Sequence, residues 1–270
     1  MESPIVTLTT DWGYRDYFTG MVKGRLYSTI PNVRVVDITH GLEPFQLSGA
    51  IIVARHACMG FPTGTIHIID ISAPRCSNDR FVVVEHGQQY YICIDNGLPS
   101  ALFGEDASHA VVVADVGLRE GFHTFAAYDV FCPVAAMLAA GAELADVGEP
   151  AESFWRYTPS QAVMMKDLLK AYVAYVDEYG NALLNITYEE FEEIRAGRDF
   201  RMQVHEVTLT EVVKSYAANL ETSNGRPSLL LTVSATGYLQ VAMPQNSAEQ
   251  FFRLRVKESV NVQFIPKIAM

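Results

Sequence analysis

Several carboxylates in this sequence stand where open α/β sheets place their ligand-binding groups. Asp11 directly follows the predicted strand Ile5 to Thr10, and Gly13 and Asp16 come soon after it. The carboxyl end of a buried strand is where such a sheet binds ligands. An ionised carboxylate only accepts hydrogen bonds and attracts positive charge, so Asp11 and Asp16 suit ribose hydroxyls and a cationic amine. The alternative is that one of them caps the following helix.

A second carboxylate with catalytic potential is Asp70, which ends the apolar run Thr65 to Ile69. Arg75 and Arg80 follow it in the sequence. An Asp beside an Arg stays ionised at neutral pH and can orient a water molecule or a substrate hydroxyl. The alternative is a solvated salt bridge on a loop, which stabilises little.

Two further segments combine polar or aromatic side chains with a glycine. The segment Asp95-Asn96-Gly97-Leu98 follows a predicted strand, and Asn-Gly is ordinarily a tight turn. In the segment Asp177 to Asn181, Tyr179 and Asn181 flank Gly180. An aromatic ring and an amide in this arrangement can stack on a purine and hydrogen-bond to it, although an ordinary hairpin explains the segment equally well.

The elements that must position these residues form two groups. From Ile5 to about Gly141, short runs rich in Val, Ile and Thr alternate with stretches of helical period, which is typical of βαβ units on a mostly parallel sheet. We therefore expect an α/β domain over residues 1–150. Its predicted strands are Ile5 to Thr10, Val33 to Asp37, Thr65 to Ile69, Phe81 to Glu85, Tyr90 to Ile94 and Ala110 to Val113. Its predicted helices are Tyr17 to Ile30, Leu47 to Met59 and Val130 to Ala140.

A stretch without regular period, punctuated by Gly148, Pro150 and Pro159, marks the predicted domain boundary. Beyond it we expect a smaller, mainly β domain over residues 163–270, with a short charged helix. The predicted strands are Ala171 to Val176, Ala182 to Ile186, Leu229 to Val233, Tyr238 to Met243 and Val260 to Phe264, and the predicted helix is Tyr188 to Arg195.

Composition excludes several classes of protein. With 270 residues, 49% of them hydrophobic, the chain can bury a full core. Its net charge of −11 argues against nucleic-acid and membrane partners, which need clustered Lys and Arg. No signal peptide is evident, and no apolar run approaches the ~20 residues that span a membrane. The four cysteines form no CxxC pair. We expect a cytoplasmic protein with reduced cysteines.

Familiar catalytic and cofactor motifs are missing from the sequence. No GxGxxG follows the first predicted strand, and P-loop, HExxH and GxSxG motifs are absent. A dinucleotide dehydrogenase or a Rossmann-type methyltransferase therefore fits poorly. No metal is implied.

Several short segments, spread over nearly the whole chain, together match the sequence pattern of one protein family in the same order. They are Thr10-Asp11-Trp12-Gly13 with Asp16, Lys23-Gly24, Val36-Asp37-Ile38-Thr39-His40, Phe61-Pro62 with Gly64-Thr65-Ile66-His67, Asp95-Asn96-Gly97-Leu98, Asp129-Val130-Phe131 with Pro133-Val134-Ala135-Ala136, Tyr179-Gly180-Asn181 with Asn185-Ile186, and Ser247-Ala248. With them the sequence resembles the S-adenosyl-L-methionine (SAM) hydroxide adenosyltransferases, SAM hydrolases that share a superfamily with fluorinase and chlorinase.

This resemblance implies an α/β domain followed by a barrel-like β domain, and a homotrimer in which SAM lies between neighbouring subunits. Asp11 would hold the ribose diol and Asp16 the methionine amine, while Phe45 would pack against the sugar or the thioether. From the other chain, Tyr179 and Asn181 would contact the adenosine. Further substrate-binding residues predicted from the matching segments are Asp95, Asn96 and Ser247. SAM is the substrate, and no separate cofactor is implied.

The same resemblance implies displacement at the ribose C5′ carbon by water, with methionine leaving as a neutral thioether. An Asp, an Arg and a His of the family bind the attacking water. Asp70 and Arg80 match the first two, with Arg75 as a second candidate for the Arg, whereas Ala126 occupies the position of the His. His123, three residues away, is the candidate substitute.

Three functions remain open at this point. The first is hydrolysis of SAM to adenosine and methionine. The second is a halide-using synthase, which the absent His favours and Asp70 disfavours, because a carboxylate repels an anion. The third is a catalytically impaired protein that binds SAM or a related nucleoside, for which Ala126 is the motivation.

Overall fold

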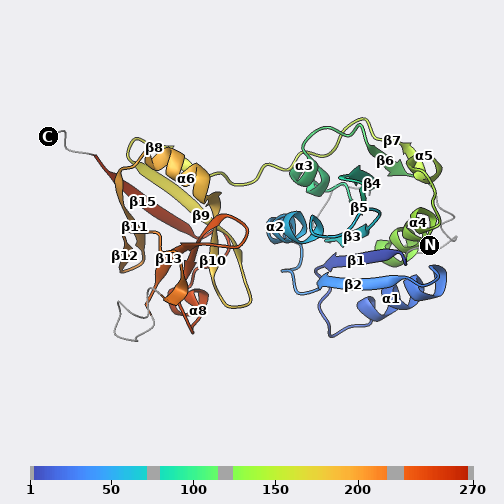
Figure 1. The fold of residues 1–270 in the computed structure, drawn as a ribbon, viewed down its shortest axis with the longest axis horizontal. Helices are drawn as coiled ribbons and strands as arrows, with labels where there is room; N and C mark the ends of the chain where they lie inside the picture. The colour runs from blue at the N-terminus through green and yellow to red at the C-terminus, as the bar shows by residue number, and fades with distance from the viewer. Residues whose placement is uncertain (1–2, 72–79, 115–123, 218–227, 267–270) are drawn as a thin grey trace. The chain divides into compact units, whose positions relative to one another are not determined.

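The computed structural model describes residues 3–71, 80–114, 124–217 and 228–266. The chain divides into two compact units, Met1–Thr158 and Pro159–Met270. Each unit has a hydrophobic core of its own. We describe the two units separately (Figure 1).

The first unit is a seven-stranded mixed sheet with strand order β2-β1-β3-β5-β4-β6-β7. Its strands are β1 (Ile5–Thr10), β2 (Arg34–Thr39), β3 (Ile66–Asp70), β4 (Phe81–His86), β5 (Gln89–Ile94), β6 (Ala110–Val113) and β7 (Gly148–Pro150). β2, β1, β3 and β5 pair in parallel, and the remaining pairs are antiparallel. The register pairs Thr10 with Asp70, so the carboxyl ends of β1 and β3 lie side by side.

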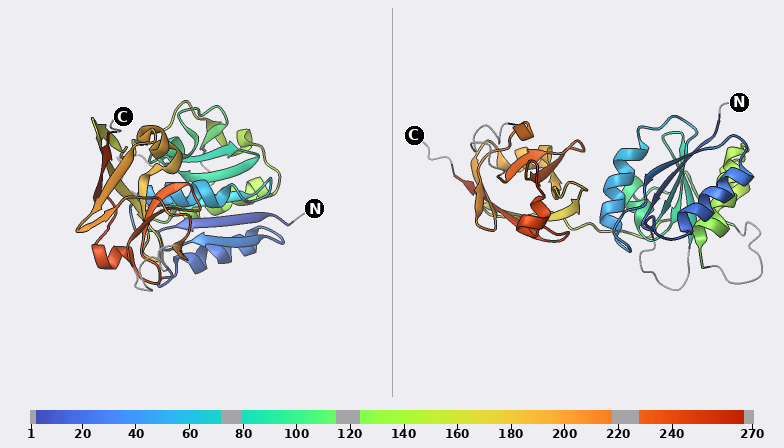
Figure 2. Two further views of the ribbon diagram at one scale, coloured as in Figure 1. Left: turned by 60° about the vertical axis from the view of Figure 1, so that its left-hand side comes forward. Right: turned by 90° about the horizontal axis from the view of Figure 1, so that it is seen from below.

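Helices cover both faces of this sheet, as the right-hand view in Figure 2 shows for α1, α2 and α4. The helices are α1 (Phe18–Thr29), α2 (Leu47–Cys58), α3 (Leu98–Phe103), the π-helix η1 (Ala127–Phe131), α4 (Cys132–Ala139) and α5 (Leu144–Val147). Val22 and Leu26 of α1 pack with α4 onto Leu8 and Ile68. Side chains alternate between the faces of a strand, so Thr10 and Asp70 share the face of Leu8 and Ile68, while Thr7 and His67 lie on the opposite face.

The second unit is an eight-stranded antiparallel sheet that forms a nearly closed, barrel-like structure. Its elements are β8 (Val163–Met165), β9 (Leu168–Val176), β10 (Ala182–Thr187), α6 (Tyr188–Arg195), β11 (Asp199–Val204), β12 (Val207–Leu209), β13 (Leu230–Val233), β14 (Tyr238–Ala242), α8 (Ala248–Phe252) and β15 (Ser259–Ile265). Thr187 and Glu190 form a capping box that starts α6. Alternating burial along β11 and β15 gives each strand one apolar face toward the core.

The predicted fold class, an α/β domain followed by a smaller mainly β domain, is confirmed. Most of the predicted helix Val130 to Ala140 is the α-helix α4, with Pro133 in its first turn. Its first two residues belong to the π-helix η1, which begins earlier, at Ala127. Cys58, Cys93 and Cys132 are buried free thiols, and Cys76 lies outside the described residues. Within the described parts of the chain, every helix is too short or too polar to cross a bilayer.

Candidate active site

Asp11 and Asp70 come together at the carboxyl ends of two adjacent parallel strands. Asp70 ends β3 and is 4% exposed, and Asp11 follows β1 and is 8% exposed. Burial raises the pKa of Asp70 to about 7, and the nearby charge of Asp11 also acts to raise it, while a hydrogen bond from the Trp12 side chain lowers it. Asp70 is therefore a buried carboxyl that changes charge near neutral pH, which suits a general base.

The loop after β1 is held from two sides. The Gly13 amide donates to the His40 carbonyl at 2.7 Å, and the Phe45 amide donates to Asp11 Oδ2 at 3.0 Å. Phe45 itself has left-handed backbone torsion (φ 66°), and its ring is 60% exposed. The structure thus places Asp11 and Phe45, two predicted substrate-binding residues, in direct contact.

Asp16 is exposed in the same loop, just ahead of α1. The residue preceding α1 is Tyr17, and no side chain caps the helix there. The capping alternative is therefore wrong for both Asp11 and Asp16, and Asp11 instead accepts from the Phe45 amide. Because Asp16 is exposed, its carboxylate is open to solvent.

Arg80 is directed at Asp95 in the described structure. Its guanidinium lies 3.3 Å from Asp95 Oδ2, and it also donates to the Ser153 carbonyl at 2.7 Å. Asp95 is fully buried, and its Oδ1 accepts from the Trp155 amide at 2.9 Å. This ion pair ties the strand ends to residues 153–155, so its contacts explain a structural role, and catalysis by Arg80 stays a prediction.

Asn96 also bonds to the backbone beside the acidic pair. Its side chain donates to the carbonyl of Ile71, directly after Asp70, and accepts from the Leu98 amide. Gly97 follows with φ +98°, and a Cβ there would lie 2.9 Å from Tyr157 Cβ. The segment is a tight turn that only glycine fits and that fixes the end of β3. Ligand contacts for Asp95 and Asn96 stay predictions.

An aromatic cluster borders the Asp11 loop. The Trp12 ring stacks on His40 and meets the edge of Phe125, which in turn contacts Phe18. Phe125 and Ala126 stand immediately before the π-helix η1, a rare element that is frequent at functional sites. The other two residues predicted near the nucleophile, Arg75 and His123, lie outside the described residues.

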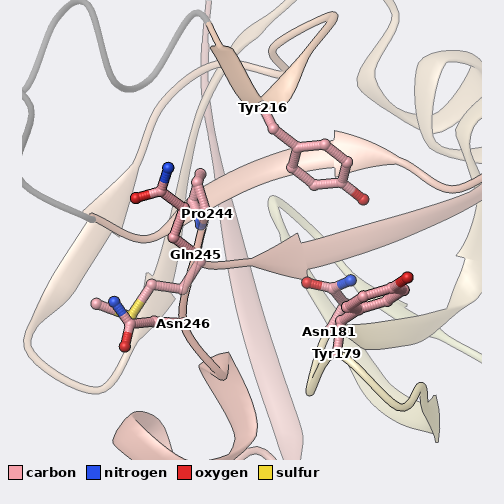
Figure 3. A pocket seen from close by; sticks show the side chains of 7 residues that line it. Tyr179, Asn181, Tyr216, Pro244, Gln245 and Asn246 are labelled. Atoms are coloured by element: carbon pink, nitrogen blue, oxygen red, sulfur yellow. The ribbon is translucent and has the colours of Figure 1, made fainter.

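The second unit carries a pocket of about 350 Å³. Figure 3 shows Tyr179 and Asn181 together on one side, the Tyr216 ring on another, and Gln245 and Asn246 across from them. Its lining of aromatic rings and amide groups matches the demands of a purine base, which presents a flat face and a hydrogen-bonding edge. The structure thus brings the predicted residues Tyr179 and Asn181 together at one pocket.

Asp177 organises this side of the pocket, a role that was not predicted for it although it begins the predicted segment. Its Oδ1 accepts from the amides of Tyr179 and Asn181, each at 2.9 Å, and its Oδ2 accepts from Asn181 Nδ2 at 2.8 Å. An Asp two residues before a turn amide is a recurrent turn signal that would have revealed it.

Two neighbours of this turn explain its remaining geometry. A Cβ on Gly180 (φ +74°) would lie 2.0 Å from Ser247 Oγ, so a side chain is excluded there. Ser247 itself caps α8 by accepting from the Gln250 amide. Its predicted role in binding substrate stays a prediction.

Replacing Asp177 with Ala is expected to weaken adenosine binding by roughly 10-fold or more, because the turn that presents Tyr179 and Asn181 loses its three hydrogen bonds and binding must then order it. Isothermal titration calorimetry with adenosine measures this. Glu178→Ala is the matched control, because Glu178 is the exposed neighbour in the same turn. Equal affinities for the two variants would contradict the role of Asp177.

Comparison with known proteins identifies the family of this chain. A sequence model described as the SAM hydroxide adenosyltransferase N-terminal domain matches residues 6–148, and one described as the C-terminal domain of the same family matches residues 171–261. The chain belongs to the SAM hydroxide adenosyltransferase family. The predicted resemblance is thereby confirmed.

Relatives of this family member include a protein from Salinispora arenicola named (R)-S-adenosyl-L-methionine hydrolase, 32% identical over 69% of this chain and 73% of the relative. A Methanocaldococcus jannaschii protein of the same name is 22% identical over 96% of this chain and 95% of the relative. A fluorinase from Actinopolyspora mzabensis is 24% identical over 96% of both chains.

Among solved structures, an uncharacterized conserved protein from Thermotoga maritima superposes with a TM-score of 0.80. It is 25% identical to this family member, and the match covers 96% of this chain and 99% of the other. A conserved hypothetical protein from Thermus thermophilus shares the fold with a TM-score of 0.69 at 23% identity, over 98% of this chain and 100% of the other.

Proposed function

We propose that this protein hydrolyses SAM to adenosine and L-methionine. The observation that carries the proposal is the buried Asp70, whose pKa lies at about 7 beside Asp11, in a chain that belongs to the SAM hydroxide adenosyltransferase family. Relatives named SAM hydrolase support the substrate and the reaction.

The reaction needs little acid catalysis. Water attacks the ribose C5′ carbon, a C–O bond forms, and the C5′–S bond breaks with its electron pair moving to sulfur. The positively charged sulfonium becomes the neutral thioether of methionine, so the leaving group needs no proton. The water loses one proton, for which ionised Asp70 is the proposed acceptor, and the protein's further task is to position the reactants.

The proposed binding roles follow the two clusters of side chains. Asp11 accepts hydrogen bonds from the ribose diol, and the exposed Asp16 pairs with the methionine ammonium. Phe45 presents its ring beside Asp11, which supports packing against the sugar or the thioether. Tyr179 and Asn181, in the second unit, bind the adenine. Arg80 and His123 are the proposed remaining contacts to the attacking water.

The direct test incubates purified protein with SAM and follows adenosine and methionine by chromatography. Formation of both in equal amounts, above the non-enzymatic rate, is the expected result. A 5′-halo-5′-deoxyadenosine that forms only with chloride or fluoride would instead indicate a halide-using synthase. The acidic pair disfavours that outcome, since two carboxylates repel an anion. SAM binding without turnover would show a binding protein and reject hydrolysis.

The proposal includes a homotrimer whose neighbouring subunits share one adenosyl group. Light scattering after size-exclusion chromatography tests the assembly state. Mixing an Asp11→Ala chain with an Asn181→Ala chain under conditions of subunit exchange, with activity measured at SAM concentrations well below either variant's KM, tests the sharing. Recovery of activity in the mixture is expected, because some mixed sites then carry both native residues, and no recovery would reject shared sites.

A further inference from the structure

His40 is a fully buried residue that touches the Asp11 loop at both ends. It follows β2, and its Nδ1 lies 2.6 Å from the Thr10 hydroxyl, immediately before Asp11. Its carbonyl accepts from the Gly13 amide at 2.7 Å, immediately after Trp12. One residue at the end of β2 therefore contacts the chain on both sides of the Asp11-Trp12 pair, through the Thr10 side chain and through the Gly13 backbone.

The other nitrogen of the His40 ring faces a charged pair, Asp37 and Lys23. Its Nε2 lies 3.2 Å from Asp37 Oδ1, and the other Asp37 oxygen accepts from Lys23 Nζ at 2.6 Å. A carboxylate only accepts, so the proton of a neutral ring sits on Nε2, and Nδ1 then accepts the Thr10 hydroxyl proton. Burial lowers the pKa of His40 and outweighs the charge of Asp37, which keeps the ring neutral.

The two residues inside this bracket both act on the candidate site. Asp11 carries the carboxylate proposed for the ribose, and its charge acts on Asp70. Trp12 stacks on the His40 ring and hydrogen-bonds to Asp70. Because the His40 side chain is fully buried, its influence on a ligand must pass through these neighbours.

We propose that His40 is a positioning residue that holds Asp11 and Trp12, and through them Asp70, in the arrangement required for substrate binding and water activation. The catalytic part of this inference rests on the proposed function, whereas its structural part, control of Trp12, does not. Lys23 and Asp37 form the support that orients the ring.

The first unit contains a matched control pair. Thr7 Oγ1 lies 2.7 Å from Nδ1 of His67, another fully buried histidine, which stacks on Tyr91. This pair has the same chemistry on the same strand β1 but lies on the opposite face, three residues (~10 Å) before Thr10. Thr7→Val and Thr10→Val thus remove equivalent hydroxyl groups, and only Thr10→Val acts beside Asp11.

The experiment uses full-length protein with Trp155→Phe, which removes one of the two tryptophans. Trp12 is then the only source of tryptophan fluorescence. Trp12 emission and kcat/KM for SAM are measured for Thr10→Val, Thr7→Val and Thr10→Ser. We expect Thr10→Val to shift the emission and to lower kcat/KM at least ~10-fold, Thr10→Ser to restore both, and Thr7→Val to change neither. Similar melting temperatures for the two Val variants separate positioning from stability.

Two results would overturn the inference. The first is a Thr10→Val variant with the emission and kcat/KM of Thr7→Val, and the second is a Thr10→Ser variant that fails to restore them. Should Thr10→Val not fold, Asp37→Asn, which weakens the support of His40 without a change of size, is judged by the same measurements. If the parent protein does not hydrolyse SAM, the proposed function fails, yet Trp12 emission still decides the positioning role.

Discussion

Asp70→Asn is expected to lower kcat for SAM hydrolysis by ~10²- to 10⁴-fold, the usual effect of removing a general base. KM should change much less, because the amide keeps the size of the carboxyl and Asp70 is not among the groups proposed to bind SAM. Initial rates of adenosine formation at saturating SAM measure the change. A variant that retains more than about half of the parent kcat would show that Asp70 is not the base.

The pH dependence of the parent enzyme provides the second measure of Asp70. Its pKa is raised from 3.8 to about 7, and the active form of a base is the ionised one. Activity should therefore rise with pH through about 7 and be lost below it, and Asp70→Asn should remove this limb. A rate that is constant from about pH 5 to about pH 8 would contradict the assignment.

Thermal stability serves as the control for Asp70→Asn. A carboxyl whose pKa is higher in the folded state binds its proton more tightly there, so its ionisation destabilises the fold as pH rises from 3.8 towards 7. The neutral Asn avoids this cost, and its melting temperature at about pH 8 should equal or exceed that of the parent. Lost activity in a more stable protein cannot be ascribed to unfolding.

Asp11→Asn is expected to raise KM for SAM by roughly 10- to 150-fold, which corresponds to ~1.5–3 kcal/mol for charged hydrogen bonds to the ribose. It should also shift the acidic limb of the pH profile to lower pH, because the charge of Asp11 is one of the causes that raise the pKa of Asp70. Full kinetics between about pH 5 and about pH 9 measure both effects in one variant.

The matched control for Asp11→Asn is Asp199→Asn, an exposed carboxylate at the start of β11 in the second unit. It removes the same charge and should leave KM and the pH profile unchanged. An acidic limb that stays at the parent pH in Asp11→Asn would show that the two carboxylates are not coupled, even if KM rises.

Much of the fold follows from local pattern. β1 and β6 begin and end where their Val, Ile and Thr runs predict, and α6 matches its charged segment because the Thr187 and Glu190 capping box fixes its start. β11 was not among the predicted strands, although its polar and apolar residues alternate as in a half-buried strand. β12 spans only Val207–Leu209, which is too short to show a period, and it is defined by its pairing with β11. α3 is short, and it starts directly after Gly97, whose backbone packs against Tyr157. These two residues are far apart in the sequence, so local pattern does not reveal their contact.

The candidate site was predictable where its residues follow strands. Asp11 and Asp70 were each predicted because they stand at the carboxyl end of an apolar strand, and the pairing of β1 with β3 brings them together. No role was predicted for His40 and Trp12, although both occur in the matching segments, because their roles arise from a ring stack and two loop hydrogen bonds that no periodicity reveals. Arg80 was assigned to the nucleophile, yet its guanidinium lies against buried Asp95, a partner that only the antiparallel pairing of β4 with β5 brings close.

The left-handed torsion of Phe45 bears on how tightly a ligand is held. A non-glycine residue in this conformation costs about 1–2 kcal/mol, and the hydrogen bond from the Phe45 amide to Asp11 offsets that strain. This hydrogen bond fixes the backbone that carries the exposed Phe45 ring, so binding of the proposed substrate does not have to order that segment. For the proposed substrate, we therefore expect part of the affinity to come from this ordered backbone, in addition to contact with the Phe45 ring.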